Sequence, residues 1–401
     1  MKTKRWKLAL ALAVCAASLG AQAQGIRPSY SFPSGNRAGG VQLGDTGVFA
    51  APYIGAGVGH DDNLFITHDN QKGSTIGTVT PGLRLDARTE ASVLQFNYQA
   101  QIGKYSDSHD DDYVDQTSRF QSDTAFSRRS FLRVGLEYDR LHDPRGSTDR
   151  PFSSAPDKYE QFTPSATYAF GAPGAEGRIE LYTSDMRRRY LNNREFTATS
   201  DRDVPEYGGA FYWRAMPKTY LLFEGRRDLI RYDISNPVSG HEDRFFVGAS
   251  WEATAATTGI FKVGRMERKF DSDLPSESFT VWEGDILWTP RTYSSFDFFT
   301  VRSTNESTGV GTFILSSIGG VTWNHAWSSY VTSQVTARYQ KDEFQGANRT
   351  DETSSLGLKI GYRFRPWLTL GAEYTYTHRD SNQSIYQYDR NLYLITATSS
   401  L

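Results

Sequence analysis

The sequence is poor in cysteine, in net charge and in familiar catalytic motifs. Its one cysteine, Cys15, lies in the N-terminal segment expected to be removed on secretion, so the mature chain can form neither a disulfide nor a thiolate metal site. The formal net charge is −2, which gives no electrostatic case for nucleic acid as a partner. G-x-S-x-G, H-E-x-x-H and P-loop motifs are absent, so none of the enzyme classes that they mark is indicated.

Long hydrophobic runs are also absent beyond the N-terminus. The mean hydropathy is negative, and no segment after residue 23 approaches the ~20 apolar residues that a spanning helix needs. A β-strand can still cross a membrane, because only every second residue of a barrel strand faces lipid. Aromatic residues and glycine are abundant instead, with 24 Phe, 23 Tyr, 8 Trp and 35 Gly. This composition is typical of an outer-membrane barrel.

The N-terminus has the three-part pattern of a secretory signal. Four basic residues within Met1–Lys7 precede an apolar run over Leu8–Gly20, and Ala21-Gln22-Ala23 supplies the small residues of a cleavage site. We predict a signal peptide over 1–23, since the apolar run is too short for a membrane anchor. Residues 24–46 are predicted to form a flexible segment, either periplasmic or lumenal, and the barrel is predicted over 47–401.

Alternation with a period of two is the main signal of secondary structure. From Leu94 to Gly103, apolar residues occupy the even positions up to Ile102, and Gln or Asn occupies the odd positions up to Gln101. The segments Leu356–Phe364 and Leu368–Tyr376 also alternate, and helical spacing explains none of the three. The pattern recurs along the chain. It predicts an all-β fold, namely a transmembrane antiparallel β-barrel of the bacterial outer membrane with about 18 strands.

The predicted connections alternate between long and short. His60–Gly73, His142–Lys158 and Lys341–Thr350 are among the long ones, and Arg88–Ala91 and Ala215–Pro217 are among the short ones. Outer-membrane barrels have short periplasmic turns and longer extracellular loops. The long set is therefore expected to be extracellular.

Tryptophan gathers near the short turns. The residues concerned are Trp213, Trp251, Trp288, Trp327 and Trp367. Because tryptophan favours the membrane–water interface, the clustering predicts a periplasmic-side girdle. A soluble β-sandwich, with tryptophan in its core, gives no reason for such clustering.

The polar face of the strands is expected to line the lumen with charges of both signs. The candidates are Arg133, Arg178, Arg226, Arg265, Arg338, Arg363, Glu137, Glu180, Glu224 and Glu373. Several opposite charges are spaced by two residues and so share a face. Two interpretations stay open: ion pairs that neutralise each other in a wet barrel, or an arginine-rich track for a polar or anionic solute.

No constellation for catalysis or metal binding stands out. Six of the seven histidines lie in predicted extracellular loops or at their edges, and only His325 lies near a strand end on the other side. The acidic clusters at His60–Asp62 and His109–Asp112 lack EF-hand spacing, which favours solvated loops over a calcium site. We therefore expect no enzyme activity, no cofactor and no metal.

Three motifs in the first quarter of the chain resemble a known family. Asp61-Asp62-Asn63-Leu64-Phe65 is followed by Pro81-Gly82-Leu83 and then by Asp111-Asp112-Tyr113. In this order they resemble the outer-membrane β-barrel porin family that includes EpsL-type proteins of exopolysaccharide biosynthesis and export. The residues that match best are Asp61, Asp62, Asn63, Phe65, Pro81 and Gly82, and a structural role at the first extracellular loop is expected for the first stretch.

The resemblance implies an outer-membrane channel that exports extracellular polysaccharide, and it supplies no catalytic residues. Outer-membrane lipid and a polysaccharide substrate are the partners it implies, together with periplasmic and inner-membrane export components. The alternative is a general diffusion porin or a structural barrel with a closed lumen. An exporter should keep an open, polar lumen and depend on those components, whereas a porin needs none of them.

Overall fold

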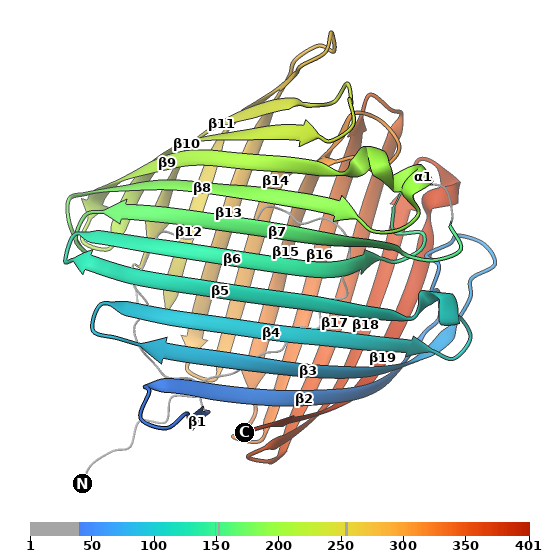
Figure 1. Cartoon of the computed structure of the whole chain (residues 1–401), viewed down its shortest axis with the longest axis horizontal. Helices are drawn as coiled ribbons and strands as arrows, with labels where there is room; N and C mark the ends of the chain where they lie inside the picture. Colours follow the sequence, from blue (N-terminus) through green and yellow to red (C-terminus); the bar gives the residue numbers. More distant parts are fainter. Residues whose placement is uncertain (1–39, 149, 151–152, 253–255) are drawn as a thin grey trace.

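The computed structural model describes residues 40–148, 150, 153–252 and 256–401. The predicted signal peptide, 1–23, and most of the predicted segment 24–46 lie outside the described residues. The described residues form one antiparallel sheet that curls into a barrel (Figure 1). No helix among them is long and apolar enough to cross a bilayer.

The barrel wall has 18 strands, as the alternation predicts. They are β2 (Val48–Asp61), β3 (Ser74–Arg88), β4 (Ser92–Tyr105), β5 (Tyr113–Ser127), β6 (Ser130–Asp143), β7 (Asp157–Phe170), β8 (Gly177–Tyr190), β9 (Arg202–Met216), β10 (Thr219–Tyr232), β11 (Gly240–Trp251), β12 (Thr257–Phe270), β13 (Glu277–Arg291), β14 (Ser294–Glu306), β15 (Phe313–Ala326), β16 (Val331–Gln345), β17 (Arg349–Arg365), β18 (Leu368–Ser381) and β19 (Tyr388–Ser400).

Each wall strand pairs with its sequence neighbours, and β19 pairs with β2 to close the barrel. A two-residue strand, β1 (Val41–Gln42), adds to β2. The connections hold α1 (Arg194–Thr197) and three 3-10 turns, η1 (His109–Asp111), η2 (Ala198–Ser200) and η3 (Ser384–Tyr386). The prediction of a closed all-β barrel is confirmed.

Alternation decides which side chains face the lumen, because successive residues of a strand point to opposite faces. On β10, Leu222, Glu224 and Arg226 are buried on the inner face, and Phe223 between them is exposed on the outer face. Large apolar side chains are exposed on the outer face of other strands too, for example Phe245 of β11. An outer face of this kind suits the hydrocarbon of a bilayer.

One end of the barrel carries most of the long connections, and we call it the long-loop end. The connections 62–73, 144–156 and 191–201 lie there, and the other end, the short-turn end, has turns such as 128–129 and 217–218. The five tryptophans named above lie at the short-turn end, in turns or near strand ends. Among them Trp213, on the outer face of β9, is about half exposed. This position fits an interfacial girdle.

The predicted long connection Lys341–Thr350 is wrong. β16 continues to Gln345 and β17 begins at Arg349, so only the turn 346–348 remains. The charged segment from Lys341 to Glu343 resembles a loop in the sequence. In the fold it forms strand, because it pairs residue by residue with 350–352 of β17.

Tyrosines fit over glycines on neighbouring strands. Tyr53 lies directly opposite Gly82, and a Cβ atom on Gly82 would be 2.1 Å from the tyrosine ring. Gly103 stands in the same relation to Tyr113, with a distance of 2.2 Å. At these positions only glycine leaves room for the ring. This packing explains the glycine of the Pro81-Gly82-Leu83 motif.

The sheet separates between β13 and β14 toward the long-loop end. The two strands stay paired up to Trp282 opposite Arg302. Beyond that point β14 remains paired only with β15, where Glu306 lies opposite Phe313. We call residues 303–315, with their connection, the hairpin tip.

The hairpin tip folds into the barrel against the inner faces of β10–β12. Glu306 pairs with Arg268 at 2.8 Å and accepts a hydrogen bond from the hydroxyl of Tyr232. Thr304 donates to the carboxylate of Glu242 at 2.6 Å. The tip therefore covers this part of the wall, which explains why Glu242 and Arg268 are only 1 % and 0 % exposed.

Candidate functional site

The candidate site is the lumen, and all the predicted lining residues except Arg265 lie on the inner face. On β12 the inner positions are Lys262 and Arg268, both buried, whereas Arg265 shares the exposed outer face with Phe261 and Val263. Arg265 and Glu267, two residues apart, do share a face of β12, but it is the outer face. The outer face of β12 changes from apolar to charged toward the long-loop end. The prediction for Arg265 is wrong because charge on that part of the strand does not mark the inner face.

Four charges form a quartet on the inner faces of β10, β12 and β13. Arg226 lies 2.6 Å from Glu224 and 3.0 Å from Glu283. Lys262 lies 2.5 Å and 2.8 Å from the same two carboxylates. All four side chains are 5 % exposed or less. Each charge thus has at least two opposite charges as partners, and Arg226 also lies 3.9 Å from Glu206. Such pairing offsets the cost of burying an ion.

A second cluster lies closer to the long-loop end. Arg244 of β11 pairs with Asp228 at 2.8 Å and with Glu242, and Glu242 also pairs with Arg268 at 2.8 Å. The hairpin tip completes this cluster through Glu306. We call the inner faces of β10–β13 with these two clusters the ion wall.

The other predicted charges are partly paired. Arg133 pairs with Asp123 at 2.6 Å, Arg178 with Glu180 at 3.1 Å, Glu137 with Arg119 at 2.8 Å and Glu373 with Lys359 at 2.5 Å. For these residues the geometry supports mutual neutralisation. Arg338 and Arg363, in contrast, form no ion pair with any residue that the structure describes.

Neutral side chains line the inner faces of β4 and β15 and the short-turn half of β16, and we call these segments the amide–hydroxyl wall. Its side chains are Gln95, Asn97, Gln99, Gln101, Thr322, Asn324, Gln334 and Thr336, and all of them are at least partly exposed to the lumen. Gln99 accepts a hydrogen bond from Tyr53 at 2.8 Å, and Gln334 donates to Asn324 at 2.8 Å. Amides and hydroxyls have several donor and acceptor sites each, so these groups retain capacity for solute.

The family motif at Asp61–Phe65 fastens the closing seam of the barrel. Asp61 at the end of β2 is buried and pairs with Arg390 of β19, with one contact at 3.0 Å. Asp62 accepts hydrogen bonds from the backbone and the side-chain amide of Asn391, both at 2.7 Å. The two carboxylates join the first and last strands of the wall.

The next residues of the motif order the first long connection. The amide of Asn63 donates to the carbonyl oxygens of Thr67 and Asp389, both at 2.9 Å. The ring of Phe65 lies 4.3 Å from the guanidinium of Arg145, which comes from the connection 144–156. The motif therefore has a structural role here, and Pro81 lies on the outer face opposite Ile54.

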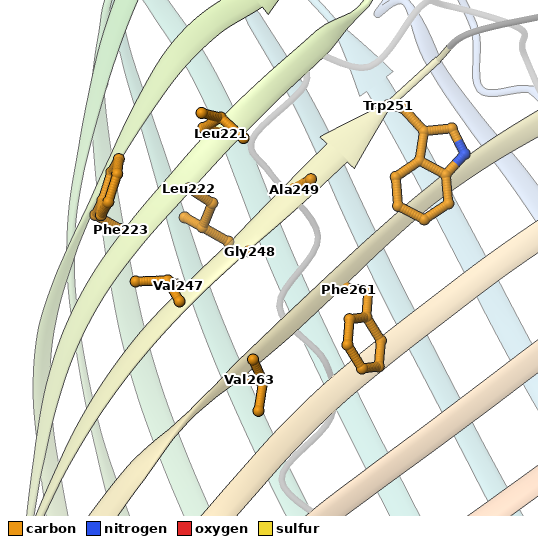
Figure 2. A pocket seen from close by; sticks show the side chains of 9 residues that line it. All are labelled: Leu221, Leu222, Phe223, Val247, Gly248, Ala249, Trp251, Phe261 and Val263. Carbon is orange, nitrogen blue, oxygen red and sulfur yellow. The ribbon is translucent and has the colours of Figure 1, made fainter.

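Outside the barrel, β10–β12 form an apolar crevice (Figure 2). Its lining is Leu221, Leu222, Phe223, Val247, Gly248, Ala249, Trp251, Phe261 and Val263. Apart from Leu222 and Gly248, which occupy inner-face positions, the lining residues lie on the outer face beside Trp251. An apolar lining offers nothing to a polar solute, so the crevice is not a transport site.

Within the described residues no group of three or more His, Cys, Asp or Glu side chains could hold a metal ion. Several histidines pair individually with carboxylates instead. His142 lies 2.9 Å from Asp115 and His378 lies 2.9 Å from Asp389.

Comparison with known proteins identifies the family. The chain matches the Putative beta-barrel porin 2 family over residues 33–400. It belongs to this family. The match spans the whole described barrel, so the protein is a porin-type barrel of the bacterial outer membrane, and its family is one of channels rather than enzymes. No curated protein matches the chain.

Solved structures with similar folds share little sequence with this porin. OccAB3 of Acinetobacter baumannii has a TM-score of 0.48 and 12 % identity, covering 90 % of this chain and 100 % of its own. For the outer membrane protein opdK from Pseudomonas aeruginosa the TM-score is 0.48 and the identity 9 %, with coverage of 88 % and 99 %. The FrpB iron transporter from Neisseria meningitidis has a TM-score of 0.44 and 11 % identity over 82 % of this chain. The match covers only 62 % of FrpB.

Proposed function

We propose that this porin passes polysaccharide across the outer membrane through its lumen. The observation that carries the proposal is the amide–hydroxyl wall. A sugar chain presents many hydroxyl groups, and these exchange hydrogen bonds readily with glutamine, asparagine and threonine. A polymer slides along many weak contacts of this kind, whereas one tight site would hold it in place.

The ion wall supports this function without contacting the polymer. Its charges are paired and covered, so they offer little to a passing solute. They stiffen the four strands β10–β13, while the amide–hydroxyl wall stays available for hydrogen bonding. The EpsL-like motifs add to the case, and they suggest that periplasmic and inner-membrane export components deliver the polymer.

A general diffusion porin is the second candidate. The same half-exposed amides and hydroxyls suit water and small polar solutes, since nothing about them requires a polymer. The two functions differ in what the cell loses without the protein. An exporter is needed for secreted polysaccharide, and a diffusion porin is needed for uptake.

A deletion strain tests the proposal. We expect less polysaccharide in the medium and polymer retained in the periplasm, with uptake of small solutes unchanged. Normal secretion together with slower uptake would reject export and leave the diffusion porin. Complementation with the wild-type gene provides the control.

The wall itself is tested with the purified barrel in a planar bilayer. Replacing Gln99, Gln101, Gln334 and Asn324 together with alanine should weaken the current block caused by dextran, because the hydrogen-bonding groups are gone. The conductance for potassium chloride should remain or rise. A variant that dextran blocks as well as wild type would show that these groups do not contact sugar.

A further inference from the structure

A small polar cavity lies in the lumen beneath two of the long connections. Its volume is about 50 Å³, enough for a carboxylate group or a water molecule or two but not for a sugar ring. The wall strands β16–β19 supply most of its lining, and the connections 62–73 and 144–156 supply the rest. The residues are Ile66, Ser147, Arg338, Gln340, Asp342, Thr353, Ser355, Arg379 and Tyr388.

Two arginines of this cavity differ from those of the ion wall. Arg338 donates one hydrogen bond to Gln340 at 2.8 Å, and Arg379 donates one to the hydroxyl of Thr353 at 3.3 Å. Neither forms an ion pair with a described residue. Each guanidinium has five N–H donors, so most of their donors are available to a ligand. The strand register places Arg338 opposite Ser355 and Arg379 opposite Thr353, so both arginines border the same small patch of β17.

A buried hydroxyl in the cavity also lacks a partner. Tyr388 is 3 % exposed, and its hydroxyl has no hydrogen bond within the described structure. Burying an unsatisfied hydroxyl is costly, and native proteins rarely accept that cost without a function. Its ring lies 4.9 Å from the guanidinium of Arg379, so the hydroxyl and the guanidinium belong to one site.

The only carboxylate in the lining, Asp342, is already engaged. It accepts hydrogen bonds from Ser316 at 2.5 Å and from Gln340 at 2.7 Å. Two arginines and one aspartate leave the cavity with a net positive charge. A cavity of this charge and size selects a small anion with oxygen acceptors.

We propose that the cavity binds the carboxylate of an acidic sugar residue, with Arg338, Arg379 and the hydroxyl of Tyr388 as its ligands. The sugar ring stays in the lumen, where the hydroxyls of Thr353 and Ser355 and the amide of Gln340 are close by. Arginine recognises a carboxylate through parallel N–H donors, which favours a uronate over a neutral sugar. This inference rests on the proposed function and specifies its substrate as an acidic polysaccharide.

Single-channel recording of the purified, full-length barrel tests the site. Trigalacturonate is the acidic probe and maltotriose is the neutral probe of equal length. We expect trigalacturonate to block the current at a concentration at least tenfold lower than maltotriose. R338Q and R379Q should each remove most of this difference, and Y388F should reduce it several-fold with both arginines intact.

R227Q is the matched control, because Arg227 makes an ion pair with Asp243 on the outer face of the barrel. It makes the same change of charge outside the lumen and should leave both blocks unchanged.

Equal block by the two sugars in the wild-type barrel would overturn the inference, and so would full selectivity in R338Q, R379Q and Y388F. Block by inorganic phosphate at the same concentration as by trigalacturonate would assign the cavity to small anions and reject a sugar site.

The two proposals fail differently. Normal polysaccharide secretion in the deletion strain, with selective block by trigalacturonate, would reject export while the acidic-sugar site stands. Lost secretion with no selectivity would keep export and reject the site.

Discussion

The ion wall and the amide–hydroxyl wall follow the same strand pattern but meet different surroundings. On the ion wall, Arg226, Lys262 and Arg268 are buried, and each is bonded to two carboxylates. On the amide–hydroxyl wall, Gln99 and Gln334 remain partly exposed and make single, neutral hydrogen bonds. The ion wall neutralises its charges internally, whereas the amide–hydroxyl wall keeps its neutral groups open to solvent.

The difference suggests that two parts of the barrel have different functions. Buried charges lock their neighbours in place, since removing either partner leaves an uncompensated ion. Neutral, half-exposed groups can exchange partners at little cost. The barrel therefore has a rigid sector, β10–β13, and neutral strand segments that can interact with solute, and four substitutions test this division.

The largest effect is expected for Arg268→Met, which removes the cation between Glu242 and Glu306. Stability should fall by about 3–5 kcal/mol, because the mostly buried Glu306 loses its ion-pair partner and the buried Glu242 loses one of its two. Guanidinium unfolding of the barrel in detergent measures this loss. Arg227→Met, which breaks an ion pair on the outer face, serves as the control and should leave the midpoint nearly unchanged. An equal unfolding midpoint for both variants would mean that water reaches the charges of the ion wall and screens them.

Thr304→Val should have the next largest effect. It removes the hydrogen bond from the hairpin tip to Glu242, a loss of about 1.5–3 kcal/mol for a bond to a charged group. The valine keeps the shape of the side chain. Because the tip is held less firmly, the single-channel conductance should also become noisier. A quiet channel with full stability would indicate that the tip is held by its other contacts alone.

Gly82→Ala tests the packing beside the amide–hydroxyl wall. The added methyl group should push Tyr53 off the glycine and break its hydrogen bond to Gln99, at a cost of about 1–3 kcal/mol for overpacking. Thermal unfolding monitored by loss of β-sheet signal measures the change. Adding Tyr53→Ala should restore part of the stability if the ring is the obstacle, and no recovery would point to the backbone instead.

Gln99→Ala is expected to have the smallest effect on stability, about 0.5–1.5 kcal/mol, since it removes one neutral hydrogen bond. Its consequence should appear in transport, as a slightly higher conductance and a weaker block by dextran. A loss of stability as large as that of Arg268→Met would erase the distinction between the two walls.

Local patterns in the sequence predict most of the barrel. The face on which Glu224, Arg226 or Gln99 lies follows from period-two alternation, which needs only the residues of one strand. The strand count follows from the same pattern. Arg265 shows the limit: its strand is correct, but its face depends on where the outer surface of β12 changes from apolar to charged.

Such patterns cannot predict contacts between residues that are far apart in the sequence. Nothing near Thr304 in the sequence indicates that it bonds Glu242, 62 residues away. The cavity likewise joins Arg338 to Arg379 and Tyr388, and it is covered by Ile66 from the other end of the chain. Of these residues, only Arg338 was a candidate from the sequence.

The sequence by itself determined an outer-membrane barrel of 18 strands with a polar interior, because strand pairing and lipid exposure act on each hairpin in turn. The tertiary structure decided which interior groups are neutralised and which can meet a solute. That outcome depends on the closing seam between β2 and β19, on the hairpin tip between β14 and β15, and on the long connections near the cavity. Each of these brings together residues far apart in the chain, so burial and pairing there are set only once the barrel has closed.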